Sequence, residues 1–169
     1  MEDYLVIGGG GFLGRSIVEM LLQRQESVSV FDVKQSFDDS RLKEFVIGDV
    51  TRFSDLRQAC EGKSVVIHTA SPPHGLDEHI YFKVNVEGTQ NVIQACRDAG
   101  VEKLVYTSSA SVVFNGNQLL DGDEQTPYCS QHMDAYNETK SIAEKAVIEA
   151  NSQSLLTIAL RPSGIFGPK

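Results

Sequence analysis

A glycine-rich stretch near the N-terminus has the residue types and spacing of a phosphate-binding turn. A short apolar run leads into four successive glycines, and a helical pattern begins near Phe12. The glycines allow two registers, Gly8-x-x-Gly11-x-x-Gly14 and Gly9-x-Gly11-x-x-Gly14. Either register lets the backbone approach a phosphate closely and then packs a helix against a sheet. The N–H groups at the start of that helix, helped by the helix dipole, suit a pyrophosphate.

An acidic residue follows at the distance where dinucleotide-binding folds contact a ribose. Residues 27–31 predict a second strand that ends in Asp32, eighteen positions beyond Gly14. A carboxylate there accepts hydrogen bonds from both ribose hydroxyls and repels a 2′-phosphate, so the sequence favours NAD over NADP. Lys34 nearby could soften that preference. An aspartate that merely ends a strand is the alternative.

A tyrosine and a lysine four positions apart form the second group of interest. Tyr136 and Lys140 open a helical pattern, so their side chains share one helical face. Such a pair also arises by chance on solvated helices. Here it follows an expected strand that delivers Ser108, Ser109 and Ser111. In a parallel α/β sheet the glycine turn, the serine cluster and the tyrosine helix converge at the carboxyl edge.

The elements that must position these residues alternate between strand-like and helical runs, which is typical of a parallel sheet covered on both faces. We expect strands at 4–7, 27–32, 43–47, 64–69, 103–107 and 155–161, and helices at 12–25, 54–60, 78–99 and 136–151. Ser54 is the expected N-cap of the second helix, and Gly100 ends the third. The predicted fold class is α/β, a doubly wound parallel sheet of the Rossmann type.

Two polar residues and one long loop add to this outline. Asp49 follows a strand at the edge where such sheets bind ligands, and could accept from an adenine amino group or be an ordinary turn aspartate. Asn85 is expected to be structural and to bond a strand end across the sheet. The loop at 112–135 contains Asn115-Gly, Asp121-Gly and Thr126-Pro. Connections of that length in a compact domain are usually functional or disordered.

Composition narrows the classes of function. The 169 residues, 41% of them hydrophobic, are enough for one domain with a sizeable core. A net charge of −8 argues against a nucleic-acid partner. The three cysteines lack Cys-x-x-Cys spacing and the four histidines lack metal-site spacing, so we expect reduced thiols and no metal. Without a long apolar run or a signal-peptide pattern, the visible chain is expected to be soluble.

These motifs resemble the extended short-chain dehydrogenase/reductase family, and within it the 3β-hydroxysteroid dehydrogenase branch. The resemblance covers essentially the whole chain and rests on residues 6–14, 30–32, 48–50, 68–73, 84–89, 107–111, 136–140 and 161–168. The segments 69–73 and 108–111 point to the sterol-oxidising members more than to sugar-nucleotide epimerases. One departure is Ile7, which stands where the broader family commonly has a threonine.

The resemblance implies NAD-dependent oxidation of a 3β-hydroxyl on a steroid or sterol in sterol biosynthesis, with a 4α-carboxysterol and its decarboxylation as the expected case. It implies that Tyr136 takes the hydroxyl proton, that Ser109 orients the same oxygen and that Lys140 holds the nicotinamide ribose. Because a free phenol has a pKa of about 10, Tyr136 needs nearby positive charge, which Lys140 and the oxidised nicotinamide can supply.

The NAD contacts that the glycine turn and the resemblance together predict are Gly8, Gly11, Phe12, Leu13, Gly14, Asp32, Asp49, Val50, Thr69, Ala70, Ser71, Tyr136, Lys140, Pro162 and Ser163. Pro162 and Ser163 lie in a loop that holds the nicotinamide carboxamide in the family. For Ser163 an ordinary turn residue is the alternative.

The resemblance also bears on extent and partners. Family members continue beyond the position of Lys169 into a substrate lobe and, in some, a membrane anchor. We therefore expect one NAD-binding domain, residues 1–169, with the substrate lobe largely absent, little turnover and exposed apolar surface. A homodimer through the long helices, and a location in the cytoplasm or on the cytoplasmic face of the endoplasmic reticulum membrane, are implied similarly, with membrane association only through the missing part. A sugar-nucleotide epimerase or dehydratase, and an NAD-binding module without turnover, remain alternatives.

Overall fold

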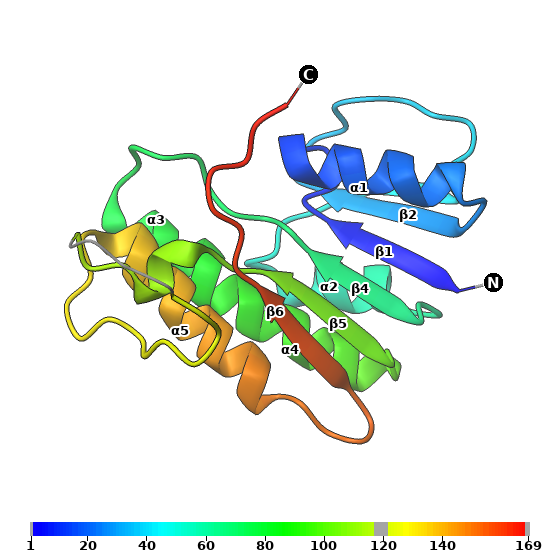
Figure 1. Ribbon diagram of the computed structural model, residues 1–169. Coiled ribbons are helices and arrows are strands. Elements are labelled where there is room, and N and C mark those ends of the chain that lie inside the picture. The colour runs from blue at the N-terminus through cyan, green and yellow to red at the C-terminus, as the bar shows by residue number, and fades with distance from the viewer. Residues whose placement is uncertain (1, 117–121, 168–169) are drawn as a thin grey trace.

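The computed structural model describes residues 2–116 and 122–167 of the chain, so the predictions that involve Asp121, Pro168 and Lys169 lie outside the described residues. A parallel sheet runs through the molecule in the order β3-β2-β1-β4-β5-β6 (Figure 1). Its strands are β1 (Asp3–Ile7), β2 (Ser27–Asp32), β3 (Glu44–Ile47), β4 (Val65–His68), β5 (Lys103–Thr107) and β6 (Leu156–Leu160). The predicted doubly wound parallel sheet is confirmed, because the strand order reverses between β1 and β4.

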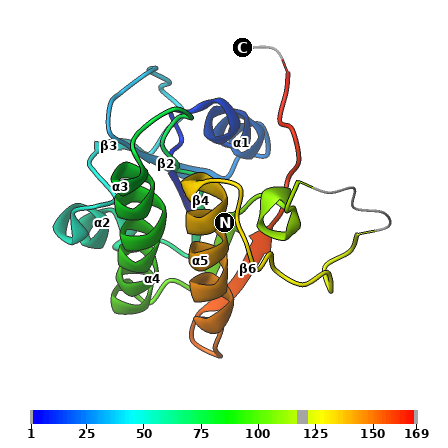
Figure 2. The same ribbon diagram turned by 90° about the vertical axis from the view of Figure 1, so that its left-hand side faces the viewer.

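Helices cover the two faces of this sheet unequally. They are α1 (Phe12–Gln23), α2 (Phe53–Cys60), α3 (Glu78–Tyr81), the π-helical η1 (Phe82–Glu87), α4 (Gly88–Ala99), the 3₁₀ turn η2 (Ala110–Val113) and α5 (Ala135–Glu149). The first helix, α1, lies on one face, and α2, α4 and α5 pack side by side on the other (Figure 2). Each predicted strand and helix is found, with ends that differ by a few residues.

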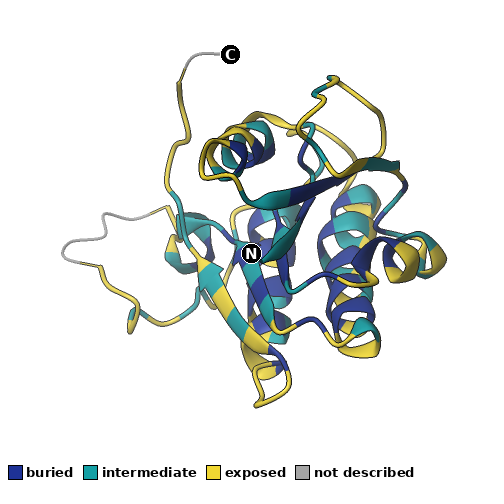
Figure 3. Ribbon diagram, turned by 90° about the vertical axis from the view of Figure 1, so that its right-hand side faces the viewer, coloured by how far each residue is buried: buried dark blue, intermediate teal, exposed yellow. Residues whose placement is uncertain are grey.

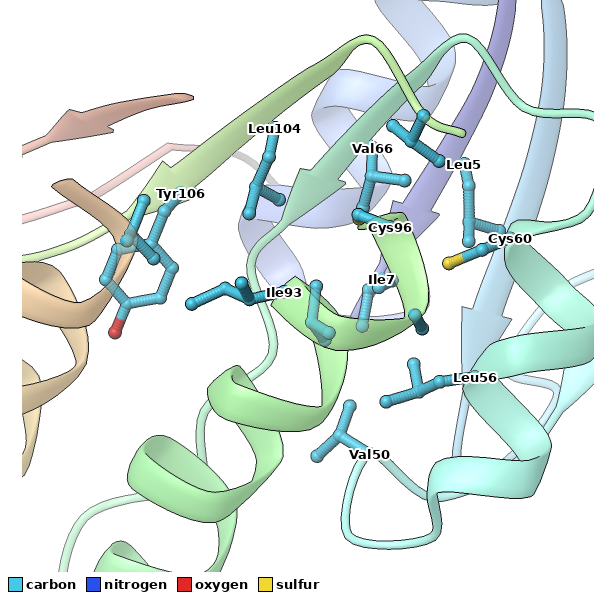
Figure 4. Packing of buried hydrophobic residues seen from close by; sticks show 14 of the residues in the cluster. Leu5, Ile7, Val50, Leu56, Cys60, Val66, Ile93, Cys96, Leu104 and Tyr106 are labelled. Atoms are coloured by element: carbon cyan, nitrogen blue, oxygen red, sulfur yellow. The ribbon is translucent and has the colours of Figure 1, made fainter. Parts of the chain in front are cut away.

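The core divides into two clusters because side chains alternate along each strand. In β1, Leu5 and Ile7 join the large cluster under α2, α4 and α5, whereas Val6 joins the small cluster under α1. The large cluster also buries Cys60 and Cys96, whose side chains Figure 4 shows among the aliphatic residues. Both cysteines, like the partly exposed Cys129, are free thiols.

The edge strand β6 has one covered face and one open face. Thr157 Oγ1 donates a hydrogen bond to the Val147 carbonyl of α5 at 2.6 Å. On the opposite face, Leu156, Ile158 and Leu160 are 54%, 53% and 50% exposed (Figure 3). Exposed apolar surface is therefore present on this strand.

Two expectations about capping and bonding are wrong. The helix α2 begins at Phe53 with Arg52 at the N-cap, two positions before the expected cap, so Ser54 lies inside the first turn. The Asn85 side chain bonds a helix instead of a strand end, because its Nδ2 donates to Thr139 Oγ1 of α5 at 3.0 Å. Gly100, in contrast, ends α4 with a φ of +70°, as predicted.

The expected long helix at 78–99 contains an irregularity. Its middle turn, η1, is π-helical, and the buried Asn85 lies within it. Across residues 2–116 and 122–167, no helix is long and apolar enough to cross a membrane.

Candidate functional site

A pocket of about 370 Å³ lies at the carboxyl edge of the sheet, next to the ends of β1, β2, β3 and β4. It contains eight of the predicted cofactor contacts, namely Gly8, Gly11, Asp32, Asp49, Val50, Thr69, Ala70 and Ser71. Residues that are distant in the sequence therefore converge on one cavity, as the position of ligand sites in open α/β sheets predicts.

The glycine turn forms one wall of the pocket. Gly8 has a φ of +81°, and a Cβ atom there would lie 2.7 Å from the Ala70 nitrogen. A Cβ on Gly14 would lie 2.1 Å from the Gly8 carbonyl oxygen. Among the described turn residues, only Gly8 has a positive φ, which supports the register that starts at Gly8.

The start of α1 offers free backbone donors. The N-cap residue of α1 is Gly11, so in the described structure no side chain accepts a hydrogen bond from the first N–H groups of the helix, and the first turn carries no acidic residue. The N–H groups of Phe12, Leu13 and Gly14 have no intrahelical acceptor, because they belong to the first helical turn. Phe12 lines an adjoining cavity, whereas Leu13 and Gly14 do not line the 370 Å³ pocket. Their contribution to anion binding is through the backbone.

Thr69 has a structural contact that the sequence does not reveal. Its hydroxyl donates to the carbonyl of Ile7 at 2.9 Å and approaches that of Gly8 at 3.3 Å. Thr69 thus ties the end of β4 to the glycine turn. This bond buttresses the turn although Ile7 itself lacks a hydroxyl.

Asp32 ends β2 at the rim of the pocket. Its Oδ2 accepts from the Gly10 N–H at 2.9 Å, and its Oδ1 accepts from the Val33 N–H at 2.8 Å. Ser36, which the sequence did not single out, donates to the Gly10 carbonyl at 3.0 Å. The carboxylate is therefore held against the glycine turn, where a ribose would follow a pyrophosphate.

Asp49 makes the bond of one of the two roles that the sequence left open. Its Oδ1 accepts from the Thr51 N–H at 2.9 Å, which is the bond of an ordinary turn aspartate. It also borders the pocket, together with Val50. An adenine contact remains a prediction.

Tyr136 lies half-buried near the N-terminus of α5, one turn before Lys140. Burial raises the pKa of the Tyr136 phenol, and the interaction with the Ser109 hydroxyl opposes that rise. Ser109 in turn accepts hydrogen bonds from the Ser111 hydroxyl at 2.8 Å and the Ser111 N–H at 3.2 Å. The structure therefore brings Ser109 and Tyr136 together, as their positions after β5 and in α5 predict.

Lys140 is buried beneath the same edge. Its Nζ donates to the Thr107 carbonyl at 2.6 Å and lies 4.4 Å from the centre of the Tyr106 ring. Burial lowers the pKa of Lys140 to about 7, although the nearby Glu144 carboxylate acts in the opposite direction. At neutral pH this amine is close to its midpoint of protonation.

A buried carboxylate, missed by sequence reasoning, connects the elements around Lys140. Glu144 is 1% exposed, and its Oε1 accepts from Arg161 Nη2 at 2.7 Å and from the Tyr128 hydroxyl at 2.8 Å. Its Oε2 accepts from the Ser108 hydroxyl. Burial alone would raise the pKa of Glu144, but the hydrogen bonds from Arg161, Ser108 and Tyr128 outweigh it, and the pKa is lowered. The only feature of the sequence that could have indicated Glu144 is its position four residues after Lys140, on the same face of the helix.

The loop after β6 lies beside the serine cluster. The Ala110 N–H donates to the Pro162 carbonyl at 2.9 Å, which fixes the two segments side by side. Ser163 is exposed, and neither Pro162 nor Ser163 borders the 370 Å³ pocket. The structure therefore places these two predicted contacts next to the Ser109 segment and outside the pocket.

The described residues fit a dinucleotide. The glycine turn has no room for side chains at Gly8 and Gly14, the α1 N-terminus is uncapped, and Asp32 follows at the rim. Within residues 2–116 and 122–167, no cluster of three or more His, Cys, Asp or Glu side chains could hold a metal ion. The fold and this arrangement of residues define a Rossmann domain of the short-chain dehydrogenase/reductase class.

Comparison with known families refines that class. Residues 5–169 match the 3-beta hydroxysteroid dehydrogenase/isomerase family. The chain belongs to this family.

Curated relatives carry the name of a sterol enzyme. The chain is 49% identical over 167 residues to the decarboxylating sterol-4-alpha-carboxylate 3-dehydrogenase of Mus musculus, a match that covers 97% of the chain and 46% of the relative. It is 48% identical over 178 residues to the enzyme of the same name from Schizosaccharomyces pombe, with 99% and 51% covered. The chain thus spans about half the length of these relatives.

Solved structures share the fold over the same extent. A short-chain dehydrogenase/reductase superfamily protein from Agrobacterium tumefaciens with bound NAD has a TM-score of 0.84 and 31% identity, covering 94% of this chain and 48% of that one. The Thermus thermophilus UDP-glucose 4-epimerase in complex with NAD has a TM-score of 0.81 and 28% identity, with 94% and 54% covered.

Proposed function

We propose that this chain binds NAD and carries the catalytic residues of a 3β-hydroxysteroid dehydrogenase that oxidises 4α-carboxylated sterols. The names of the curated relatives support the substrate class, and the NAD bound in the Agrobacterium tumefaciens protein supports the cofactor. The observation that carries the proposal is the convergence of Ser109, Tyr136 and Lys140 on the edge that also holds the glycine-turn pocket.

Each part of the pocket has a role in this proposal. Backbone N–H groups from Phe12 to Gly14 hold the pyrophosphate, and Asp32 accepts from the adenosine ribose. Asp49 and Val50 border the adenine. Residues 69–71 lie along the rest of the cofactor, and Pro162 and Ser163, beside the Ser109 segment, hold the carboxamide.

The proposed proton transfer uses Tyr136 as the base. When bound, NAD would supply the acceptor for the hydride on the carbon that carries the 3β-hydroxyl. Tyr136 takes the hydroxyl proton, and Ser109 donates a hydrogen bond to the same oxygen. Burial raises the pKa of Tyr136, so its phenolate needs the positive charge of Lys140, whose own pKa of about 7 keeps part of the population protonated at neutral pH.

Decarboxylation needs no further protein group. Oxidation converts the 3β-hydroxyl into a ketone beside the carbon that bears the carboxylate. The bond to the carboxylate then breaks, CO₂ leaves, and the electron pair passes to the ketone as an enolate that is later protonated.

Domain role, pairing and location complete the proposal. Residues 1–169 act as the NAD-binding domain, two copies pair through their long helices, and the protein works in the cytoplasm or at the cytoplasmic face of the endoplasmic reticulum membrane. The resemblance to sterol-metabolising relatives supports these assignments. Analytical ultracentrifugation tests the dimer, and subcellular fractionation tests the location.

The reaction is tested by following NADH absorbance with purified protein, NAD and a 4α-carboxylated 3β-hydroxysterol. We expect turnover by the wild-type protein and a loss of at least 100-fold in the Tyr136→Phe protein, in line with the usual contribution of a general base. Tyr4→Phe is the matched control, because the Tyr4 hydroxyl bonds Glu2 at the start of β1, at the opposite end of that strand from the site.

The outcomes separate the alternatives. Turnover that depends on Tyr136 but not on Tyr4 supports the dehydrogenase. Saturable NAD binding without turnover by the wild-type protein contradicts it and favours an NAD-binding module. Conversion of a UDP-sugar in place of the sterol points to an epimerase.

A further inference from the structure

The loop between β4 and α3 brings a histidine to the catalytic tyrosine. The loop follows Pro72 and Pro73, and its Gly75 has a φ of +88°. The buried Tyr81 holds it in place, because the Tyr81 hydroxyl donates to the Pro73 carbonyl at 3.0 Å and accepts from the Leu76 N–H at 3.3 Å. The residues between Pro73 and Leu76 therefore have a fixed position above the start of α5.

Tyr136 lies between two aromatic side chains. The centre of its ring is 4.7 Å from that of His74, at an interplanar angle of 56°, and 6.1 Å from that of Tyr81. His74 is exposed, whereas Tyr81 is buried. The imidazole thus forms the outer, solvent-facing side of the tyrosine's surroundings.

The ring nitrogens of His74 are uncommitted. They make no hydrogen bond to any other residue in the described part of the chain. Lys140 bonds the Thr107 carbonyl, and Arg161 bonds Glu144 through Nε and Nη2, while its Nη1, which has no described partner, is buried and out of reach of solvent. An imidazole N–H beside Tyr136 is therefore the available donor for an anionic group close to the reacting carbon.

The proposed substrate carries such a group. Its carboxylate is on the carbon next to the one whose hydroxyl meets Tyr136. A carboxylate that leaves water near a half-buried phenol needs a hydrogen-bond donor in place of its hydration shell.

We propose that His74 binds the 4α-carboxylate of the sterol and so selects carboxylated sterols over 3β-hydroxysteroids that lack this group. The inference rests on the proposed function, and it names a residue that contacts the part of the substrate that is later lost as CO₂. His74 takes no proton from the 3β-hydroxyl, which remains the task of Tyr136.

The test compares two substrates that differ only at carbon 4. A 4α-carboxylated 3β-hydroxysterol and its 4α-methyl counterpart are assayed with NAD and the wild-type, His74→Phe and His74→Gln proteins. Phenylalanine keeps a ring against Tyr136 but removes the N–H, and glutamine restores a donor. His79→Phe is the matched control, because His79 is an exposed histidine in α3 without a ring contact to Tyr136.

We expect His74→Phe to raise KM for the carboxylated sterol about 10-fold or more, as the loss of a hydrogen bond to a charged group implies. Its kcat/KM for the 4α-methyl sterol stays within about 2-fold of wild type. His74→Gln recovers part of the KM, and His79→Phe changes neither substrate.

Four results contradict the inference. Equal losses with both sterols assign His74 to the packing of Tyr136, and unchanged kinetics with both sterols remove it from the site. If the wild-type protein oxidises neither sterol, the proposed function fails and the inference fails with it. Oxidation of the carboxylated sterol by wild type and by His74→Phe at the same KM overturns the inference alone.

Discussion

Replacement of Glu144 by glutamine is the most informative perturbation of the scaffold. The change keeps the shape of the side chain but removes its charge. The amide oxygen can take the place of Oε1 and still accept from Arg161 and Tyr128, and the amide nitrogen must then face the Ser108 hydroxyl. Arg161, whose side chain is 19% exposed, loses its only ion-pair partner within the described residues.

The size of the effect follows from burial and from the number of bonds. Removing one partner of a buried ion pair costs about 3–5 kcal/mol, because the other charge stays buried without compensation. Arg161 retains some contact with water and the glutamine keeps its hydrogen bonds, so Glu144→Gln belongs at the lower end, about 3 kcal/mol. Glu144→Ala also removes the acceptor of the Ser108 and Tyr128 hydroxyls, so we expect a loss of stability at the upper end of this range, about 5 kcal/mol.

Urea denaturation followed by circular dichroism measures these values. With an ordinary dependence on urea, a loss of about 3 kcal/mol lowers the midpoint by about 1–2 M. The exposed Glu149, on the same helix, supplies the control, and Glu149→Gln should change stability by less than about 0.5 kcal/mol. The reasoning is refuted if Glu144→Gln behaves like that surface control.

The pH dependence gives an independent check on Glu144. The pKa of this carboxyl is lowered from its ordinary value of 4.5, so its contribution is present above pH 4.5 and is lost as the pH falls through the lowered pKa. The stability difference between wild type and Glu144→Gln should therefore shrink in acid. A difference that stays constant down to about pH 3 would contradict this assignment.

Three further changes test the turn, the buried lysine and the ribose site. Gly14→Ala should lower the free energy of unfolding, measured by urea denaturation, by about 1–3 kcal/mol, because the new Cβ would lie 2.1 Å from the Gly8 carbonyl oxygen. This loss is expected although alanine has the better helix propensity. Gly164 lies in open space, so Gly164→Ala should leave the stability unchanged. Stabilisation by Gly14→Ala would show that the turn is placed incorrectly. The pKa of Lys140 is about 7 in the folded chain, whereas the ordinary value is 10.5, so between these two pH values the unfolded chain binds more protons than the folded chain. The stability of the wild-type protein relative to Lys140→Met should therefore rise with pH over this range. Equal stability differences at pH 7 and about pH 9.5 would argue against a buried amine. Asp32→Asn should weaken NADH binding about 10-fold and narrow the preference over NADPH in fluorescence titrations, and an unchanged ratio of the two affinities speaks against a ribose contact.

The sheet and its helices could be predicted because each is encoded locally. The apolar run before His68 and the alternation before Asp32 lie within single strands, and Gly100 marks a helix end by its own conformational freedom. The meeting of Ser109 with Tyr136 also followed, since strand ends and helix starts share one edge in this fold.

The features that sequence reasoning missed or placed wrongly have different physical causes. Asn85 and Thr139 are 54 positions apart, and nothing local to either residue names the other. The π-helical turn escaped notice because six residues are too few to separate its periodicity from that of an α-helix. Ser54 is not the N-cap because α2 starts directly after Arg52, which is two positions before Ser54.

The residues of the candidate site also differ in whether the sequence alone identifies them. Gly8 and Asp32 are recognisable from spacing, whereas the part played by Glu144 appears only when Arg161 and Ser108 are brought to it by two other strands. The contact of Ser163 with the carboxamide stays a prediction, because it rests on a motif match and the described structure shows only that Ser163 is exposed.

The two buried thiols allow the local opening of the large core to be measured by chemical labelling. Cys60 ends α2 and Cys96 lies in α4, both 0% exposed, while Cys129 is partly exposed. The interaction with Cys60 and, after it, burial raise the pKa of the Cys96 thiol, which further slows its reaction while the helices are packed. A thiol-modifying reagent therefore labels Cys129 at once and the other two only when α2 and α4 separate. The slow phase of labelling measures how often this half of the molecule opens under native conditions, without any engineered probe.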